Sequence, residues 1–249
     1  MVTYEFPLRE RTRVLLRMED LYEKFRYFLD KPDALQHHVA LTTMFKVFDV
    51  DSRADLKSDL LQEMERQRQT FVGYRAHPNV QGDVLDEVVR EIEDVSSALN
   101  RFHGKTGQVI RDNEWLKAIA GHIVKPGGLC EFDMPSFYAW QQKSAEERHA
   151  DITTWFEPIF PLFRAIDLVL KLLRDSGSRT RVIAPSGAYQ QKLQGKVYQM
   201  VRIQVDPALQ FIPEVSANPH VLWVRFTSQD KSMRLSPVEE DVPFELTLC

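Results

Sequence analysis

The sequence predicts an α+β fold, with a helical bundle domain at the N-terminal side and a smaller, mainly antiparallel β domain at the C-terminus. Two observations predict this class. As far as about residue 175, apolar residues recur every three or four positions, which is the spacing of one buried helical face. After Gly177, apolar and polar residues alternate, which is typical of half-buried strands. We therefore expect a helical domain over residues 8–177 and a β domain over residues 178–249.

The first part of the bundle is predicted by three amphipathic segments. Residues 9–29 form the first expected helix and residues 33–50 the second. The third covers residues 52–72, where Ser52 and Asp55 are spaced as a capping box ahead of the apolar run. Because such a box satisfies the free amide donors of a first turn, it predicts where this helix begins.

The second part of the bundle contains helices of unequal length. A long one follows Asp83, a shorter one carries Trp115, and a pair covers residues 135–175. Pro158 and Pro161 lack the amide donors that a continuous helix needs, so we expect a bend or break near them.

The β domain is predicted by three alternating segments, residues 196–205, 220–227 and 243–248. Residues 2–6 also have strand character and are expected to add an edge strand, and residues 130–133 are a further candidate. An N-terminal strand in this domain would bring the two ends of the chain together.

Composition excludes several classes of protein. The 249 residues carry 32 Lys and Arg against 36 Asp and Glu, and this net charge of −4 argues against a protein that coats nucleic acid or anionic lipid. No stretch approaches the roughly 18 apolar residues of a membrane span, and the charged start differs from a signal peptide. We expect a cytoplasmic protein in which Cys130 and Cys249 are reduced thiols.

Motifs for catalysis and metal binding are incomplete. Residues 104–106 end like a phosphate-binding loop, but Leu99 stands where that loop needs glycine. Residues 49–60 begin like a calcium loop and then place Leu60 where a bidentate glutamate is required. The adjacent pair of histidines, 37–38, points to different helix faces. We therefore expect no catalytic residues, no metal and no cofactor.

An arginine stripe is the remaining feature with chemical meaning. Arg9, Arg13 and Arg17 recur every four residues on the first predicted helix and share one exposed line beside its apolar face. One interpretation is a solvated face with local ion pairs. The other is a row of guanidinium groups that receives a carboxylate-bearing segment, because arginine binds carboxylates in a bidentate manner.

Several motifs occur in a fixed order along nearly the whole chain. They are Phe6-Pro7-Leu8 leading into Arg13, Arg17 and Glu19; Leu60-Leu61 through Arg66-Gln67; Pro126-Gly127-Gly128 through Cys130, Phe132, Asp133, Pro135 and Trp140; and Val224-Arg225-Phe226 with Phe244-Glu245-Leu246. In these motifs the sequence resembles the ZapD family, bacterial proteins that associate with the division GTPase FtsZ and bundle its filaments. The run over residues 126–135 is the most specific, and by itself indicates a glycine turn, a short strand and a helix capped by Asp133.

The resemblance implies a non-enzymatic cell division factor that acts in the cytoplasm at mid-cell. It implies a homodimer that binds the C-terminal tail of FtsZ in a basic pocket between the two domains, cross-links the filaments, and so promotes Z-ring assembly and septation. The partner-binding residues that it implies are Arg13, Arg17, Arg53 and Arg225. The sequence departs from the family pattern at Glu114, where a basic residue can stand, and at Tyr138, where a histidine can stand.

Two other classes of function remain open from the residues alone. One is a cytosolic enzyme or phosphate-binding protein that uses the arginine cluster or Cys130. The other is a nucleic-acid adaptor, against which the overall acidity and the lack of an aromatic and basic platform both count.

Overall fold

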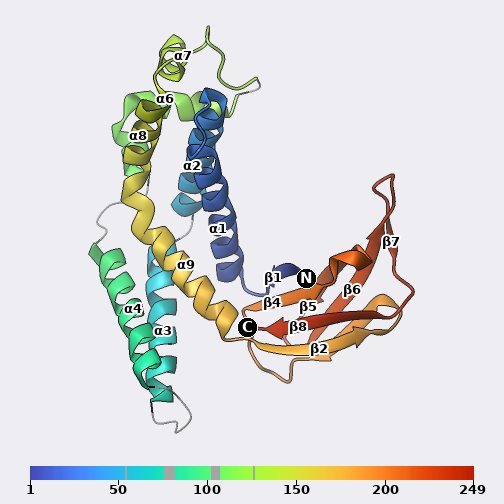
Figure 1. Cartoon of the computed structure of the whole chain (residues 1–249). Helices are drawn as coiled ribbons and strands as arrows, with labels where there is room; N and C mark the ends of the chain where they lie inside the picture. The colour runs from blue at the N-terminus through green and yellow to red at the C-terminus, as the bar shows by residue number, and fades with distance from the viewer. Residues whose placement is uncertain (54, 76–81, 102–106, 126) are drawn as a thin grey trace. The chain divides into compact units, whose positions relative to one another are not determined.

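The predicted α+β fold is confirmed: helices fill the N-terminal part of the chain, and antiparallel strands follow at the C-terminus (Figure 1). The structure is a computed structural model that describes residues 1–53, 55–75, 82–101, 107–125 and 127–249. The phosphate-loop motif at residues 104–106 lies outside the described residues.

The chain forms two structural units. The β unit contains residues 1–16 and 171–249, and the helical unit contains residues 17–170. Each unit is described by itself below. The domain limits predicted from the sequence, 8–177 and 178–249, stay a prediction about which segments fold independently.

Helices follow one another through the first part of the chain. They are α1 (Glu10–Leu29), α2 (Ala34–Arg53), α3 (Leu56–Tyr74), α4 (Gly82–Arg101), α5 (Gln108–Asp112), α6 (Glu114–Ile123), α7 (Pro135–Gln141), α8 (Ala145–Phe156), the 3-10 turn η1 (Glu157–Ile159) and α9 (Phe160–Asp175). The break expected near Pro158 is confirmed by η1. A second break was not predicted: Ser144 and Glu147 form a capping box that begins α8.

The capping box predicted for the third helix is wrong. Ser52 lies inside α2 and its hydroxyl donates to the Asp49 carbonyl at 2.8 Å. Asp55 caps α3 alone, accepting a hydrogen bond from the Ser58 amide at 3.4 Å. Because α2 continues to Arg53, only the second residue of the predicted box is free to cap the next helix.

The short strand considered for residues 130–133 is also wrong. These residues form a turn in which the amides of Asp133 and Met134 both donate to the Cys130 carbonyl, at 3.1 and 3.2 Å. Met134, not Asp133, is the N-cap of α7, with Pro135 in its first turn as expected. A carbonyl that accepts two local amides cannot pair regularly with a neighbouring strand.

Stacked aromatic rings form part of the core of the helical unit. The Phe25 ring of α1 stacks on Phe156 of α8 with centroids 4.0 Å apart, and Tyr22 stacks on Phe163 of α9 at 4.2 Å. Such pairs add about 0.5–1.5 kcal/mol each beyond the burial of their area. They join segments that are far apart in the sequence.

The β unit contains two antiparallel sheets. The strands are β1 (Val2–Pro7), β2 (Ser178–Ala184), β3 (Ala188–Lys192), β4 (Met200–Val205), β5 (Phe211–Ala217), β6 (Val221–Gln229), β7 (Leu235–Pro237) and β8 (Val242–Leu248), with 3-10 turns η2 (Pro185–Gly187) and η3 (Pro207–Leu209). One sheet has the order β1-β4-β8-β2, and the other has β3-β6-β5 with β7 beside β6. The strand expected over residues 2–6 is present as β1, which pairs with β4.

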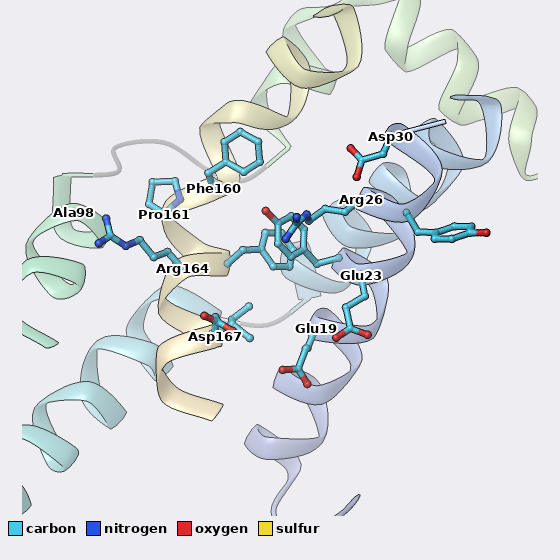
Figure 2. A pocket seen from close by; sticks show the side chains of 13 residues that line it. Glu19, Glu23, Arg26, Asp30, Ala98, Phe160, Pro161, Arg164 and Asp167 are labelled. Atoms are coloured by element: carbon cyan, nitrogen blue, oxygen red, sulfur yellow. The ribbon is translucent and has the colours of Figure 1, made fainter. Parts of the chain in front are cut away.

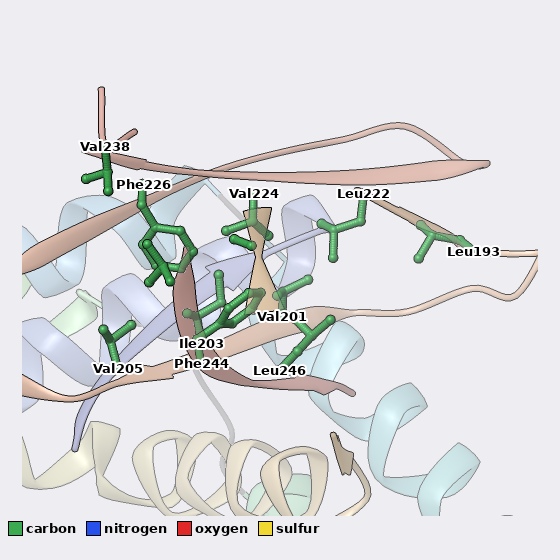
Figure 3. Packing of buried hydrophobic residues seen from close by; sticks show 12 residues of the cluster. Leu193, Val201, Ile203, Val205, Leu222, Val224, Phe226, Val238, Phe244 and Leu246 are labelled. Atoms are coloured by element: carbon green, nitrogen blue, oxygen red, sulfur yellow. The ribbon is translucent and has the colours of Figure 1, made fainter. Parts of the chain in front are cut away.

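Buried side chains from the two sheets face each other and form the core of this unit (Figure 3). Leu222, Val224 and Phe226 of β6 point toward side chains of β4 and β8. The rings of Phe226 and Phe244 meet edge to face at 5.1 Å. The three strands predicted from the sequence, β4, β6 and β8, are therefore those that carry most of the core.

An ion-pair cluster fastens β1 to this unit. The Glu5 carboxylate receives two bonds from Arg174, from Nε at 2.9 Å and Nη2 at 2.8 Å, and an ion pair from Arg202 at 2.9 Å. The side chains of Arg174, Glu5 and Arg202 are only 24%, 19% and 23% exposed, so water screens these ion pairs less than it screens pairs at the surface. The cluster holds the segment that leads into α1.

Candidate functional site

A groove in the β unit contains one of the predicted partner-binding arginines. It encloses about 580 Å³ and lies wholly within that unit. Its lining residues are Phe6, Pro7, Leu8, Arg9, Arg13, Leu193, Gly195, Lys196, Val197, Tyr198, Val215, Ala217, Asn218, Pro219 and His220. We call it the basic groove.

Residues at the start of α1 line the basic groove, and this segment is fixed on Gln199, the residue before β4. The Leu8 amide donates to the Gln199 carbonyl at 2.8 Å, and the Thr12 hydroxyl donates to the Gln199 side chain at 3.3 Å. Thr12 is only 1% exposed, so this contact is sheltered from water. Arg9, the residue before α1, and Arg13, in the first turns of the helix, remain exposed.

Two tight turns also contribute lining residues to the groove. In the first, Gln194 and Gly195 have φ of 51° and 73°, and the Lys196 amide donates to the Leu193 carbonyl at 2.9 Å. Two consecutive positive φ values are typical of the mirror-image turns that connect antiparallel strands. In the second turn the Asn218 side chain accepts from the amides of His220 and Val221, both at 2.9 Å.

The charge of the basic groove has one sign. Arg9, Arg13 and Lys196 line it together with His220, and none of the lining residues, all of which the structure describes, is acidic. Arg13 makes an ion pair with Glu10 at 3.1 Å, but both side chains are well exposed, at 45% and 75%. An exposed pair of this kind contributes only about 0.2–1 kcal/mol, so an incoming carboxylate can displace it.

The groove combines this charge with apolar walls. Leu8, Val197, Tyr198, Val215 and Pro219 supply carbon surface beside the cations. Guanidinium and ammonium groups bind carboxylates, while such walls accept aliphatic or aromatic side chains. The arrangement therefore fits an acidic peptide with interspersed apolar residues.

The four predicted site residues fall in both units. Arg13 lines the basic groove, and Arg225 is an exposed residue of β6 in the same unit that lies opposite Glu214 in the ladder. Arg17 is exposed on α1, one turn after Arg13, and belongs to the helical unit. Arg53 is the last residue of α2, and its side chain lies outside the described part of the structure. The convergence of all four stays a prediction.

Two cationic or titratable residues of the basic groove were not singled out from the sequence. Lys196 and His220 lie in loops, each next to a turn. The available signals were the Gln-Gly and Asn-Pro dipeptides beside them, which indicate turns but not which side of the sheet the turns border. Glu114 and Tyr138, the two departures from the family pattern, are exposed in the helical unit.

A second cavity lies within the helical unit, between α1, α9 and α4 (Figure 2). It encloses about 800 Å³. Glu19, Glu23, Asp30 and Asp167 line it, against two arginines, Arg26 and Arg164. Burial raises the pKa of Tyr22 in its wall, an effect that Arg26 opposes. Its excess of carboxylates does not suit an acidic peptide, so this cavity is not the predicted site.

Among the described residues, no group of three or more His, Cys, Asp or Glu side chains could hold a metal ion. In the part of the chain that the structure describes, no helix has both the length and the apolar character of a membrane span. Burial raises the pKa of the Cys249 thiol to about 11, so this thiol is protonated at neutral pH and is a poor nucleophile.

Comparison with known proteins gives consistent matches over the whole length. The sequence pattern of a family described as "ZapD: Cell division protein" matches residues 16–225. Proteins named "Cell division protein ZapD" from Janthinobacterium sp. (strain Marseille), Ralstonia pickettii (strain 12J) and Ralstonia nicotianae are 57%, 54% and 52% identical to the chain. Each match covers 100% of this chain and 99% of the relative.

Proposed function

Because the chain belongs to the ZapD family of cell division proteins, we propose that it is a non-enzymatic division factor that binds the C-terminal tail of FtsZ and cross-links FtsZ filaments. It acts in the cytoplasm at mid-cell, where it promotes Z-ring assembly and septation. The observation that carries the proposal is the basic groove, which gathers Arg9, Arg13 and Lys196 around apolar walls without an acidic side chain among its lining residues.

In the proposed mechanism the groove takes up an acidic segment of the tail. Arg13 pairs with a tail carboxylate in place of Glu10, and apolar tail residues cover Leu8 and Tyr198. Arg17, one helical turn further along α1, extends the row of positive charge. Arg53 and Arg225 complete the set of arginines that we assign to tail binding.

Cross-linking requires two tail-binding sites on one particle. A homodimer with two-fold symmetry presents two equivalent grooves, so one dimer joins two filaments. Each site needs only micromolar affinity, about −8 kcal/mol, because a filament offers many tails at high local concentration. No bond is made or broken in this scheme, and no cofactor is needed.

Co-sedimentation tests the proposed function. Purified protein is mixed with polymerised FtsZ that carries or lacks its last residues, and bundles are collected at low centrifugal force. We expect the protein to enter the pellet only with tail-bearing FtsZ. Equal sedimentation with both forms would show that the tail is not the binding partner.

A further inference from the structure

The strand that borders the basic groove has one side without a neighbour. β5 pairs with β6 on one side and is the last strand in its sheet order, β3-β6-β5, within a unit whose residues are all described. Val215 and Ala217 of this strand line the groove. An unpaired strand edge presents backbone amides and carbonyls that a further strand can bind.

The ladder between β5 and β6 shows which backbone groups face outward. The Asn218 amide donates to the Val221 carbonyl at 2.9 Å, and this pair closes the hairpin. Hydrogen-bonded and non-bonded pairs alternate in an antiparallel ladder, so Ser216 bonds to β6 while Val215 and Ala217 do not. A second hydrogen bond agrees with this alternation. The Val238 amide donates to the Phe226 carbonyl, so this carbonyl points to the side of β6 away from β5. The amides and carbonyls of Val215 and Ala217 therefore point away from β6, at the edge that borders the groove.

A proline interrupts the edge of β5, which limits an added strand to the end that borders the groove. Pro213 has no amide hydrogen and lies at an outward-facing position, where proline is tolerated on an edge strand. The stretch from Val215 to Ala217 contains no proline, lysine or other common blocking residue. It also lines one groove together with Lys196, Arg9 and Arg13.

We propose that the acidic tail binds as an extended strand added to the outer edge of β5, between Val215 and Ala217. This inference rests on the proposed function and specifies how the tail is held. Backbone hydrogen bonds to Val215 and Ala217 fix its register. Alternate tail side chains project to the Val215 face, where Arg9, Arg13 and Lys196 take carboxylates. The other face of β5 carries Glu214 and Ser216, and its cation, Arg225, lies on β6 opposite Glu214, one strand further from the added strand.

Ala217→Pro tests the added strand, because it removes an outward amide hydrogen and leaves the bonds of β5 to β6 in place. Ala217→Val is the matched control, since it also adds side-chain volume at this exposed position but keeps the amide. A synthetic peptide of the last residues of FtsZ is titrated into both variants by calorimetry. We expect the proline variant to bind about fivefold more weakly than the valine variant, the loss of one backbone hydrogen bond.

Two further measurements test the added strand without the proline variant, in case that variant folds poorly. With the unaltered protein, hydrogen exchange at the amides of Val215 and Ala217 is expected to slow at least tenfold when the peptide binds, while the amide of Ser216 stays as before. Peptides with one N-methylated amide at successive positions are expected to lose affinity at alternate positions only. Unchanged exchange at both amides, or no alternation, would overturn the added strand.

The outcomes separate the two proposals. If the peptide does not bind the unaltered protein, the proposed function fails and the added strand with it. If Arg13→Glu abolishes peptide binding but Ala217→Pro binds like Ala217→Val, the function stands and the added strand is wrong. If Ala217→Pro instead dissociates a dimer without changing peptide affinity, a second copy of the chain occupies the edge, and the proposal is again overturned.

Discussion

At the scale of single residues, backbone geometry makes one glycine of the β unit essential. Gly187 has φ of +69°, and a Cβ atom there would lie 2.3 Å from the Val238 carbonyl oxygen. The carbonyl belongs to the backbone and cannot move aside as a side-chain end can. The position therefore excludes every other amino acid for two independent reasons.

We predict that Gly187→Ala lowers the free energy of unfolding by about 3 kcal/mol, from left-handed strain and overpacking together. Gly195→Ala is the control, because Gly195 has a similar φ of +73° but no atom within 4 Å of the added carbon. The control should lose only about 1 kcal/mol. Urea denaturation measures both, and equal losses would show that the contact with Val238 is unimportant.

A buried histidine in the helical unit holds a buried arginine without any carboxylate. The Nε of Arg148 donates to Nδ1 of His37 at 3.1 Å, and Nε2 of His37 donates to the Leu29 carbonyl at 3.1 Å. The remaining nitrogens of Arg148 donate to backbone carbonyls, including that of Pro32 at 2.7 Å. His37 must stay neutral to accept this bond.

We predict that the helical unit loses stability in mild acid. Burial, more than the nearby charges of Arg148 and His149, lowers the pKa of His37 below its ordinary 6.5. Below that pH the unfolded chain binds more protons than the folded chain, so the free energy of unfolding decreases as the pH falls through 6.5 and is highest above it. Burial also lowers the pKa of His38, so His37→Asn, which keeps an acceptor and cannot titrate, should remove part of the pH dependence in urea denaturation. An unchanged slope would exclude His37 as a source.

Among the secondary-structure elements, the strands that were best predicted from the sequence are those with one face buried in the core. Phe226, Ile203 and Leu246 alternate with polar residues because their strands have one buried face, so β4, β6 and β8 were predicted. β2, β3, β5 and β7 were missed because they are short or lie at sheet edges, where Arg179 or Gln190 faces water and the alternation is weak. Strand pairing is decided by residues far away in the sequence.

The exact ends of helices are also difficult to predict from the sequence. Ser52 and Asp55 both carry good capping side chains, and nothing in the sequence between them says that α2 runs on to Arg53. We predict that Asp55→Ala costs about 1 kcal/mol of stability. Ser52→Ala should change stability by less than about 0.5 kcal/mol in the same thermal denaturation experiments. Similar losses in both variants would restore the capping box.

Only the part of the candidate site that depends on local spacing could be predicted from the sequence. The four-residue spacing of Arg9, Arg13 and Arg17 is local, so it was predictable; all three are exposed, Arg13 and Arg17 on α1 and Arg9 just before the helix begins. Lys196 joins Arg13 only because β4 pairs with β1 and the loop before β4 then borders α1. Such long-range pairing leaves no periodic signal in the chain.

In the whole molecule, tail binding depends on many weak ionic contacts made at once. The Debye length falls from about 10 Å at 0.1 M salt to about 3 Å at 1 M, so contacts at an exposed groove weaken together. We therefore predict that co-sedimentation with FtsZ filaments declines steeply as salt rises. Filaments alone, sedimented at each salt concentration, control for changes in polymerisation. Equally efficient bundling at both salt concentrations would mean that arginine pairing does not drive it.

The most direct test of the account is a titration of the FtsZ tail peptide into three forms of the protein: unaltered, Arg13→Glu and Arg90→Glu. Arg90 is an exposed arginine of α4 that does not line the basic groove, so its variant carries the same charge change at a residue outside the proposed site. Tail binding in the basic groove predicts micromolar affinity for the unaltered protein and for Arg90→Glu, and binding at least about tenfold weaker to Arg13→Glu. Equal binding to Arg13→Glu and Arg90→Glu would contradict it.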